Sequence, residues 1–250
     1  MSQTIERVSP VPYYEQLFTI LRDQIVGGDI PPDERLPSEL ELCREFGLSR
    51  ATVRQTLSKL ESEGYARRVA RRGVFASAPE LSTGWIVQDT AGFLDSQLSH
   101  GRTGIETTVI DAQFIAPPQH VSEALRVGPD EEVFALRRLR SLDGKIAVFS
   151  TNWFSSEAGK TVAGANDVLD GTGSLNSTLL RAGFVTAGAR RVIRAMHPPE
   201  GVATHLQIGR DDAVLRVRSL SWDQHEAPFD YYETWVLTDV VPLEVNVTAS

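Results

Sequence analysis

Basic side chains gather in one short stretch of the chain. Residues 50–76 contain seven basic residues against two acidic ones. Arg50 and Arg54 are four residues apart, so they share one face if the stretch is helical. An arginine can donate two parallel hydrogen bonds to guanine, and the methyl groups of Ala51 and Thr52 suit a thymine methyl. These residue types predict a surface that reads double-stranded DNA.

Two short helical patterns joined by a tight turn must position these side chains. Ser38 and Glu41 have the spacing of a capping box, in which each side chain accepts from the other residue's backbone amide. Gly47 suits the left-handed end of the first helix, and Ser49 suits the cap of the second. The apolar residues expected to face the core are Leu42, Cys43 and Phe46 in the first helix and Val53, Leu57 and Leu60 in the second. The second helix would present its first turn to a major groove.

A basic hairpin follows the two helices. Its turn, residues 70–73, reads Ala-Arg-Arg-Gly and would lie near phosphates or the minor groove. Ahead of the two helices, Gly27-Gly28 ends an amphipathic helix whose apolar face is Tyr14, Leu17, Phe18, Leu21 and Ile25. A solvated helix with scattered arginines, followed by an ordinary hairpin, is the alternative interpretation. The order of capping box, turn, second helix and basic hairpin favours a winged helix-turn-helix.

Residues 11–76 resemble the DNA-binding domain of the GntR family of bacterial transcription regulators. The resemblance rests on residues 12–17, 36–39, 49–54 and 60–64. It implies DNA contacts at Arg35, Ser38, Ser49, Arg50, Thr52, Arg54, Arg71, Arg72 and Gly73. Two positions depart from the family pattern, because Leu40 stands where arginine is frequent and Arg71 where glycine is frequent. We therefore expect one phosphate contact to be missing at Leu40, and a wing that Arg71 either bends differently or extends with a contact of its own.

Length and charge divide the chain into two parts. The 250 residues carry a net charge of −8, which is unusual for a DNA-binding protein. The two parts of the chain, however, do not share this charge equally. Residues 1–77 hold 11 Lys+Arg and 11 Asp+Glu, so the remaining 14 Lys+Arg and 22 Asp+Glu account for the whole −8. We expect a DNA-binding domain over 1–77, a linker over 78–84 and a second, acidic domain over 85–250.

Cysteine, histidine and apolar patterns narrow the class of protein. The single cysteine, Cys43, excludes an internal disulfide and suggests a reducing compartment. We interpret it as a small core residue, with a redox sensor as the alternative. The five histidines show no ligand spacing, so no metal or other cofactor is expected. Without an apolar run of 18 residues or a signal peptide, we expect a soluble, cytoplasmic protein with no membrane partner.

The second part contains an internal repeat. The matched pairs 81 residues apart are Pro117 and Pro198, Leu125 and Leu206, Gly128 and Gly209, Asp130 and Asp211, Val133 and Val214, and Arg137 and Arg218. Trp153 and Trp235 are 82 apart. Each unit has the pattern of a strand, a short helix, a glycine turn and a hairpin, with turns at 142–145 and 223–227. The repeat predicts an α+β domain in which one antiparallel sheet is covered by helices, with a cleft between the halves.

This part resembles the UTRA domain, the effector-sensing domain of the HutC branch of the GntR family, whose fold is related to chorismate lyase. The resemblance rests on residues 93–101, 138–140, 173–175 and 228–231, together with Trp235 and Asp239. It implies a homodimeric, ligand-controlled regulator, usually a repressor, with the sensor domains forming the dimer. The ligand would lie between the two repeats.

The candidate effector-binding residues suit a small anion. Arg138 and Arg140 are two apart on a predicted strand, so they share one face and could clamp a phosphate, phosphonate or carboxylate. Ser174 opens a predicted helix that ends at Arg181 and also favours an anion. Asn176 stands where sugar-phosphate sensors often have tyrosine. Asp230, beside Tyr231, could accept from a hydroxyl or amino group of the ligand.

Structural roles are the alternatives for these residues. Arg138 and Arg140 could lie on a solvated strand face or pair with Asp130 or Glu131, and Ser174 could be a plain helix cap. Asp230 could pair with an arginine. The tryptophans of the repeat, Trp153 and Trp235, favour core or dimer contacts over a ligand platform.

Departures from the sensor family point to the size of the ligand. Ser150 stands where glutamate is frequent, and Val236-Leu237 where Tyr-Arg is frequent. Fewer polar groups argue against a large hydroxyl-rich sugar, so the phosphonate-utilisation regulators of this branch are one hypothesis. Histidine-pathway, fatty-acid and amino-sugar ligands stay open.

The expected function is ligand-controlled binding of a two-fold DNA operator by a homodimer. An enzyme is the competing class, but the sequence lacks a Ser-His-Asp motif, a metal cluster or a phosphate-binding glycine loop. A constitutive DNA-binding protein, whose second domain serves dimerisation alone, is the third interpretation.

Overall fold

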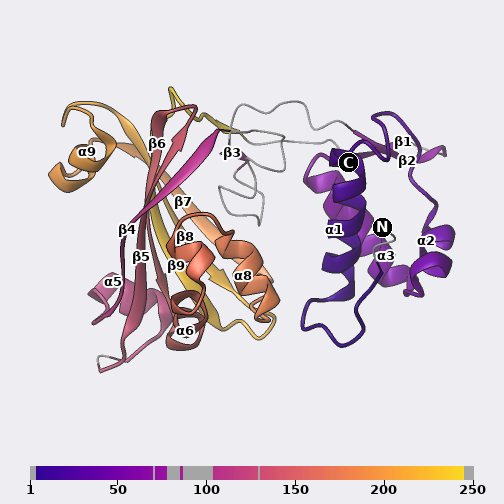
Figure 1. Ribbon diagram of the computed structural model, residues 1–250, viewed down its shortest axis with the longest axis horizontal. Coiled ribbons are helices and arrows are strands. Elements are labelled where there is room, and N and C mark those ends of the chain that lie inside the picture. Colours follow the sequence, from indigo (N-terminus) through magenta and orange to yellow (C-terminus); the bar gives the residue numbers. More distant parts are fainter. Residues whose placement is uncertain (1–3, 70, 78–84, 87–103, 129, 245–250) are drawn as a thin grey trace. The chain divides into compact units, whose positions relative to one another are not determined.

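The computed structural model describes residues 4–69, 71–77, 85–86, 104–128 and 130–244 (Figure 1). The chain divides into two compact units, one formed by the described residues up to Ser77 and the other by those from Trp85 onward. Each unit has a hydrophobic core of its own. The expected linker lies outside the described residues, as does the stretch before residue 102 that contributed to the UTRA resemblance.

The N-terminal unit is three helices and a hairpin. The elements are α1 (Tyr13–Val26), α2 (Glu39–Phe46), α3 (Arg50–Ser62), β1 (Ala66–Val69) and β2 (Gly73–Ala76). Both sequence-predicted caps are confirmed: Ser38 and Glu41 form the capping box, and the Ser49 hydroxyl accepts from the Thr52 amide. Gly47 adopts the left-handed conformation at φ 64° that ends α2. These local signals place α3 directly after a sharp turn.

One core holds the three helices and the hairpin together. Val53, Leu57 and Leu60 are fully buried, as their spacing on α3 predicts. In α2, Leu42 is fully buried, whereas Cys43 and Phe46 are partly buried against the same core. Burying these apolar side chains is the main favourable term for a domain of this size. The opposite face of α3 is left exposed.

The second unit is built on one antiparallel sheet of six strands. Its strands are β4 (Ile105–Ile115), β5 (Val133–Leu142), β6 (Lys145–Phe154), β7 (Gly188–Met196), β8 (Val214–Trp222) and β9 (Pro228–Val236). The helices of the two repeats are α5 (Gln119–Leu125) and α9 (Glu200–Leu206). The strand order is β4-β5-β6-β9-β8-β7, so each repeat supplies three neighbouring strands. The expected duplication and the α+β class are confirmed.

The two repeats meet at the β6–β9 pair. Thr151 pairs with Glu233, which is its counterpart 82 residues on, so an approximate two-fold axis passes between them. The hairpin turns also lie where the sequence predicts them. Asp143 and Gly144, at φ 50° and 75°, make the first, and Asp223 N–H donates to the Ala227 carbonyl across the second.

Helices cover the two faces of the sheet (Figure 1). Helices α5 and α9 pack on one face, against Trp153 and Trp235 respectively. The other face is covered by helices inserted between the repeats, which are α6 (Ser156–Ala163), α7 (Asn166–Leu169) and α8 (Leu175–Arg181). A short parallel pair, β3 (Trp85–Ile86) and β10 (Leu243–Glu244), completes the unit. No helix in the described part of the chain is long and apolar enough to cross a membrane.

Candidate DNA-binding surface and effector site

The first turn of α3 exposes the residues expected to meet DNA. Ser49, Arg50 and Ala51 are exposed, and Thr52 is half-buried. The Ser49 and Thr52 hydroxyls lie 2.8 Å apart, and the Thr52 amide donates to Ser49 Oγ at 3.2 Å. These contacts between Ser49 and Thr52 fix the start of α3, and Arg50 takes no part in them and stays exposed.

Acidic residues pair with most of the basic side chains in residues 50–76. Four of the seven make ion pairs, which are Arg54 with Glu39, Lys59 with Glu15, Arg67 with Asp33 and Arg68 with Glu61. Within the described residues the other three, Arg50, Arg71 and Arg72, form no ion pair. The excess charge is therefore concentrated at the start of α3 and at the tip of the hairpin, where the sequence predicts DNA contacts.

A carboxylate of α2 positions Arg54. The Arg54 Nε donates to Glu39 at 2.9 Å, and the arginine side chain stays 66% exposed. Glu39 begins α2, so the contact ties that helix to the second turn of α3. Leu40, the next residue, is 44% exposed. The carboxylate holds the stem of Arg54 and leaves its outer nitrogens on the surface.

The hairpin tip depends on Arg71 and Gly73. Arg71 has φ 61°, so an arginine adopts the left-handed conformation that glycine adopts more easily. The guanidinium of Arg35 lies against Gly73, where an added Cβ would be 3.0 Å from Arg35 Nε. Arg72 lies over the Phe75 ring at 5.5 Å. The hairpin thus brings three of the predicted DNA contacts, Arg35, Arg72 and Gly73, close together.

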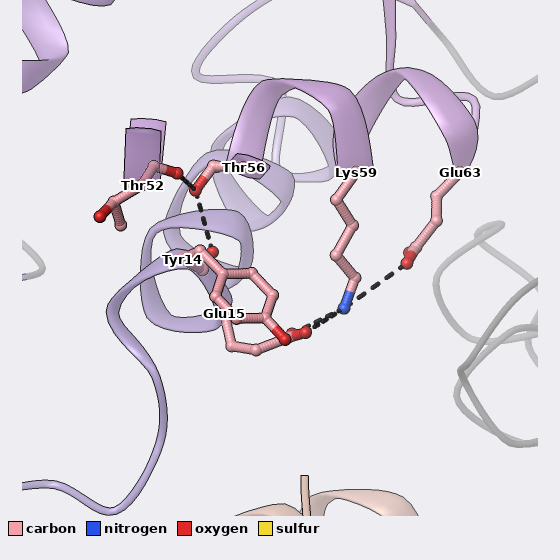
Figure 2. A network of polar contacts seen from close by, with 6 residues as sticks. All are labelled: Tyr14, Glu15, Thr52, Thr56, Lys59 and Glu63. Atoms are coloured by element: carbon pink, nitrogen blue, oxygen red, sulfur yellow. Dashed lines mark hydrogen bonds and ion pairs between the residues drawn. The ribbon is translucent and has the colours of Figure 1, made fainter. Parts of the chain in front are cut away.

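A polar network that the sequence reading missed joins α1 to α3 (Figure 2). Lys59 Nζ donates to both oxygens of Glu15, at 2.6 and 2.7 Å, and lies 3.7 Å from Glu63. The Thr56 hydroxyl lies within hydrogen-bond distance of two backbone carbonyl oxygens to which it can donate, that of Tyr14 at 3.0 Å and that of Thr52 at 3.1 Å. These side chains set the orientation of α3 on α1.

Burial keeps the Tyr14 phenol of this network in its neutral form. Burial, the neighbouring Glu15 charge and a hydrogen bond to Glu15 together raise the pKa of Tyr14 to about 12. The phenol is therefore neutral at any ordinary pH. In the sequence, Glu15 is only a charged residue within the amphipathic pattern of α1, and nothing local links it to Lys59, 44 residues later.

In the second unit, Arg138 and Arg140 lie buried on the sheet face that α6–α8 cover. They are 4% and 5% exposed, which rules out a solvated strand face. Arg138 Nη2 donates to Asn152 Oδ1 at 2.9 Å, and Arg140 Nη1 donates to Ser150 Oγ at 3.1 Å. These two hydrogen-bond acceptors are on β6 and carry no charge. The two guanidinium groups share one face, as their spacing predicts.

Asp230 lies on the same face, on β9, the strand of the second repeat that pairs with β6. Asn152 Nδ2 donates to Asp230 Oδ1 at 2.9 Å, so one carboxamide bridges Arg138 and Asp230. Burial raises the pKa of Asp230 to about 6, against the lowering effects of the Asn152 hydrogen bond and the Arg138 and Arg191 charges. A carboxyl group that titrates near neutrality is a frequent feature of binding sites.

Further polar side chains complete this face, and sequence reasoning missed them. Thr234 on β9 is buried opposite Ser150, and Ser219 on β8 is buried opposite Tyr232. Arg191 on β7 donates from Nε to the Tyr232 hydroxyl at 3.2 Å. We call Arg138, Arg140, Ser150, Asn152, Ser219, Asp230, Tyr232 and Thr234 the polar strip. It crosses the β6–β9 junction between two apolar clusters.

Tyr231, which we expected beside Asp230 in the effector site, lies on the opposite face of the sheet from the polar strip. Successive residues of a strand face opposite sides, so Tyr231 lies on the other face from Asp230. There it stacks on Trp153 with ring centroids 5.9 Å apart, in the core under α5. Tyr232, one residue on, faces the strip instead. Trp153 and Trp235 are core residues on that opposite face, 8% and 3% exposed.

Ser174 and Asn176 lie on the same side of the sheet as the arginines. Ser174 Oγ accepts from the Ser177 amide at 3.0 Å and so caps α8, as the sequence predicts. Leu175 packs in the cluster under α6. The loop before it approaches β4 so closely that a Cβ at Gly171 would overlap the Thr107 carbonyl oxygen. Thr107 pairs with Arg140, which places this loop at the Arg140 end of the strip.

The described residues contain no group of three His, Cys, Asp or Glu side chains that could hold a metal ion. What they contain is a winged helix-turn-helix with surplus cations at its recognition positions, in one chain with a duplicated sheet domain that buries a polar strip. This combination defines a DNA-binding regulator of transcription with a ligand-sensing domain.

Comparison with known families agrees with that class. The UTRA domain model matches residues 100–241, and the model of bacterial regulatory proteins of the gntR family matches residues 13–76. The chain belongs to the GntR family of bacterial regulatory proteins, in the HutC-type group that carries a UTRA domain. Proteins of this family are DNA-binding regulators and not enzymes.

Individual relatives match half of the chain or most of it. The transcriptional repressor NagR of Bacillus subtilis is 36% identical over 136 residues, which are 54% of this chain and 55% of NagR. The match thus spans little more than half of that relative. The transcriptional regulator GmuR of Bacillus subtilis is 26% identical over 235 residues, covering 91% of this chain and 97% of GmuR. The crystal structure of YydK from Bacillus subtilis superposes with a TM-score of 0.72 at 18% identity, covering 94% of this chain and all of YydK.

Proposed function

We propose that this protein is a homodimeric repressor that leaves a two-fold DNA operator when a small anionic metabolite binds its sensor domain. The observation that carries the proposal is the distribution of charge in the N-terminal unit. Of the seven basic residues between positions 50 and 76, the three that form no ion pair within the described residues are Arg50, Arg71 and Arg72, at the start of α3 and at the hairpin tip. Repression is proposed because NagR, a relative, is a repressor. Two-fold operators follow from a dimer that carries two winged helices.

In this proposal the start of α3 reads bases and the hairpin holds the backbone. Arg50 and Arg54 contact base edges, with Glu39 limiting the directions that Arg54 can take. Ser38, Ser49 and Thr52 contact phosphates with their hydroxyls. The wing contributes Arg71, Arg72 and Gly73, and Arg35 lies against it.

The effector in this proposal binds on the polar strip. Arg138 and Arg140 hold its anionic group, and Ser174 and Asn176 close the same end of the site. Asp230 receives a hydrogen-bond donor of the effector. Binding would favour one arrangement of the two DNA-binding domains, since a ligand acts only through its differential affinity for the two states. The protein would act in the cytoplasm, where the operator is.

Binding to DNA from the protein's own upstream region tests the proposal. Fluorescence anisotropy would be measured over a salt titration, and phosphate, phosphonates and sugar phosphates would then be added. We expect a specific, salt-sensitive complex that one anion class releases. A specific complex that no anion changes would remove the effector role of the strip. Equal affinity for this DNA and for random DNA would contradict the proposal that the protein binds a specific operator there.

A further inference from the structure

One hydrogen-bonded chain joins a buried cation to a buried acid in the polar strip. Arg138 donates to the Asn152 carbonyl oxygen, and the Asn152 amide donates to Asp230, each at 2.9 Å. All three residues are less than one-tenth exposed. The positive and the negative group are therefore held apart by the length of a single carboxamide, inside the sensor domain.

Hydrogen-bonding capacity also remains on the Asp230 side of the strip. The Ser219 hydroxyl, 1% exposed, has no hydrogen-bond partner within the described residues. Ser219 pairs with Tyr232 on β9, and Tyr232 pairs in turn with Asn152 on β6. A buried hydroxyl is normally satisfied by protein, water or ligand. Near Asp230, the Ser219 hydroxyl can therefore bind a polar group that the described protein residues do not supply.

We propose that the effector is a small molecule with an anionic group at one end and an amine at the other. The anion lies on Arg138 and Arg140, and the amine lies on Asp230 and Ser219, with Asn152 alongside. This inference rests on the proposed function and names its ligand class. It makes Asp230 the residue that distinguishes an amine-bearing effector from a plain anion.

An amine suits Asp230 better than a hydroxyl does. Burial penalises the charged carboxylate and brings its pKa to about 6, so the group is ionised at neutral pH at a cost. A hydroxyl offers a hydrogen bond alone, whereas an ammonium also offers the opposite charge. The charged groups that face Asp230 are Arg138 on β5 and Arg191 on β7. The anion of the same ligand offsets their repulsion of the ammonium.

Matched probes of equal length test the inference. Calorimetry with the full-length protein would compare aminoethylphosphonate, hydroxyethylphosphonate and propylphosphonate, and β-alanine with butyrate. An ammonium on a buried carboxylate should improve affinity over the methyl analogue by about tenfold or more. Equal affinity of the amine and methyl members contradicts the inference, and so does the absence of any binding by the amines.

Asp230→Asn isolates the acid. The variant keeps the shape and can still accept from Asn152, and we expect the amine and methyl probes to bind it equally. Thr151→Val, a buried change on the opposite face of β6, is the matched control and should keep the preference. With the unaltered protein, the amine preference should shrink as the pH falls below about 6 and Asp230 takes up a proton. If the preference for the amine probes changes neither with pH nor in Asp230→Asn, the amine binds to another residue and the inference is wrong.

The outcomes separate this inference from the proposed function. If plain anions release the operator and Arg138→Ala abolishes that release, the regulator stands and the amine is unnecessary. If no anion changes the operator complex, the proposed effector control falls with it.

Discussion

Among the residues of the DNA-binding unit, Arg50 and Arg67 differ in whether a carboxylate holds the guanidinium. Arg50 begins α3 without an ion pair in the described part of the chain, whereas Arg67 is held by Asp33 at 2.7 Å. A paired guanidinium must lose its carboxylate before it meets DNA, and an unpaired one need not. The two arginines therefore form a matched pair for mutagenesis.

Arg50→Ala should weaken operator binding by about 1–3 kcal/mol and relax the sequence preference at one base pair per half-site. Arg67→Ala should change operator affinity much less. Anisotropy with the operator and with single-base variants would measure both. Equal losses on operator and random DNA would show that Arg50 holds phosphate and does not read a base.

The ionisation of Asp230 makes the stability of the sensor domain depend on pH. Because burial raises its pKa from 3.8 to about 6, the folded protein binds this proton more tightly than the unfolded chain does. The ionised carboxylate therefore costs stability at neutral pH, and the cost is relieved as the pH falls through about 6 toward 4.

Asp230→Asn should raise the free energy of unfolding of the sensor domain at neutral pH by on the order of 1–3 kcal/mol. The advantage should narrow at about pH 5, where the native Asp230 is largely protonated. Urea unfolding followed by tryptophan fluorescence reports on this domain, because all four tryptophans lie at or after residue 85. A gain that is constant with pH would assign the effect to packing.

At the scale of elements, α3 is positioned by a charged network instead of apolar contacts alone. Lys59 and Glu15 have side chains only 19% and 11% exposed, so their pairing is worth more than that of a surface ion pair. Removing Lys59 alone leaves the Glu15 and Glu63 carboxylates without this ammonium, whereas removing Glu15 as well leaves only that of Glu63.

Lys59→Met should destabilise the DNA-binding unit by about 1–3 kcal/mol, and the double change with Glu15→Gln should recover part of that loss. Hydrogen exchange in α1 and α3 would report it, since this unit contains no tryptophan. Additive losses in the double variant would mean that the two side chains do not stabilise each other.

A second element-scale test concerns the loop that reaches the Arg140 end of the strip. Gly171 and Gly144 both have positive φ, at 85° and 75°, but only Gly171 faces the Thr107 carbonyl, while Gly144 has open space. Gly144→Ala should cost about 1–2 kcal/mol for its backbone conformation alone. Gly171→Ala should cost more, because the loop must also move away from β4, and anion binding should weaken with it. Equal losses in urea unfolding would show that the contact with β4 is unimportant.

At the scale of the whole molecule, a two-fold dimer counts every DNA contact twice. If Arg72 of each wing contacts one phosphate, Arg72→Ala removes two contacts per dimer. The slope of log affinity against log salt should then fall by about 2, against about 1 for a monomer. Anisotropy at several salt concentrations measures the slope, and analytical ultracentrifugation measures the mass of the species that binds. An unchanged slope would place Arg72 away from the backbone.

Local signals in the sequence determined the winged helix-turn-helix. The capping box at Ser38, the left-handed Gly47 and the Ser49 cap each involve residues three or four apart, so their physics is visible without the fold. The repeat, with Trp153 and Trp235 in matching places, likewise determined two equal sets of strands. The alternation of β5 was enough to put Arg138 and Arg140 on one face.

Tertiary structure alone decided which charges are free and which polar groups meet. Glu39 and Arg54 are 15 residues apart, Glu15 and Lys59 are 44 apart, and Asn152 and Asp230 are 78 apart. No local rule specifies such pairs, because they depend on which strands become neighbours and which helix faces pack. The position of Tyr231 is different, because strand alternation alone puts it on the opposite face from Asp230 and puts Tyr232 on the same face. The family was within reach of the sequence, and the chain of contacts from Arg138 to Asp230 required the sheet.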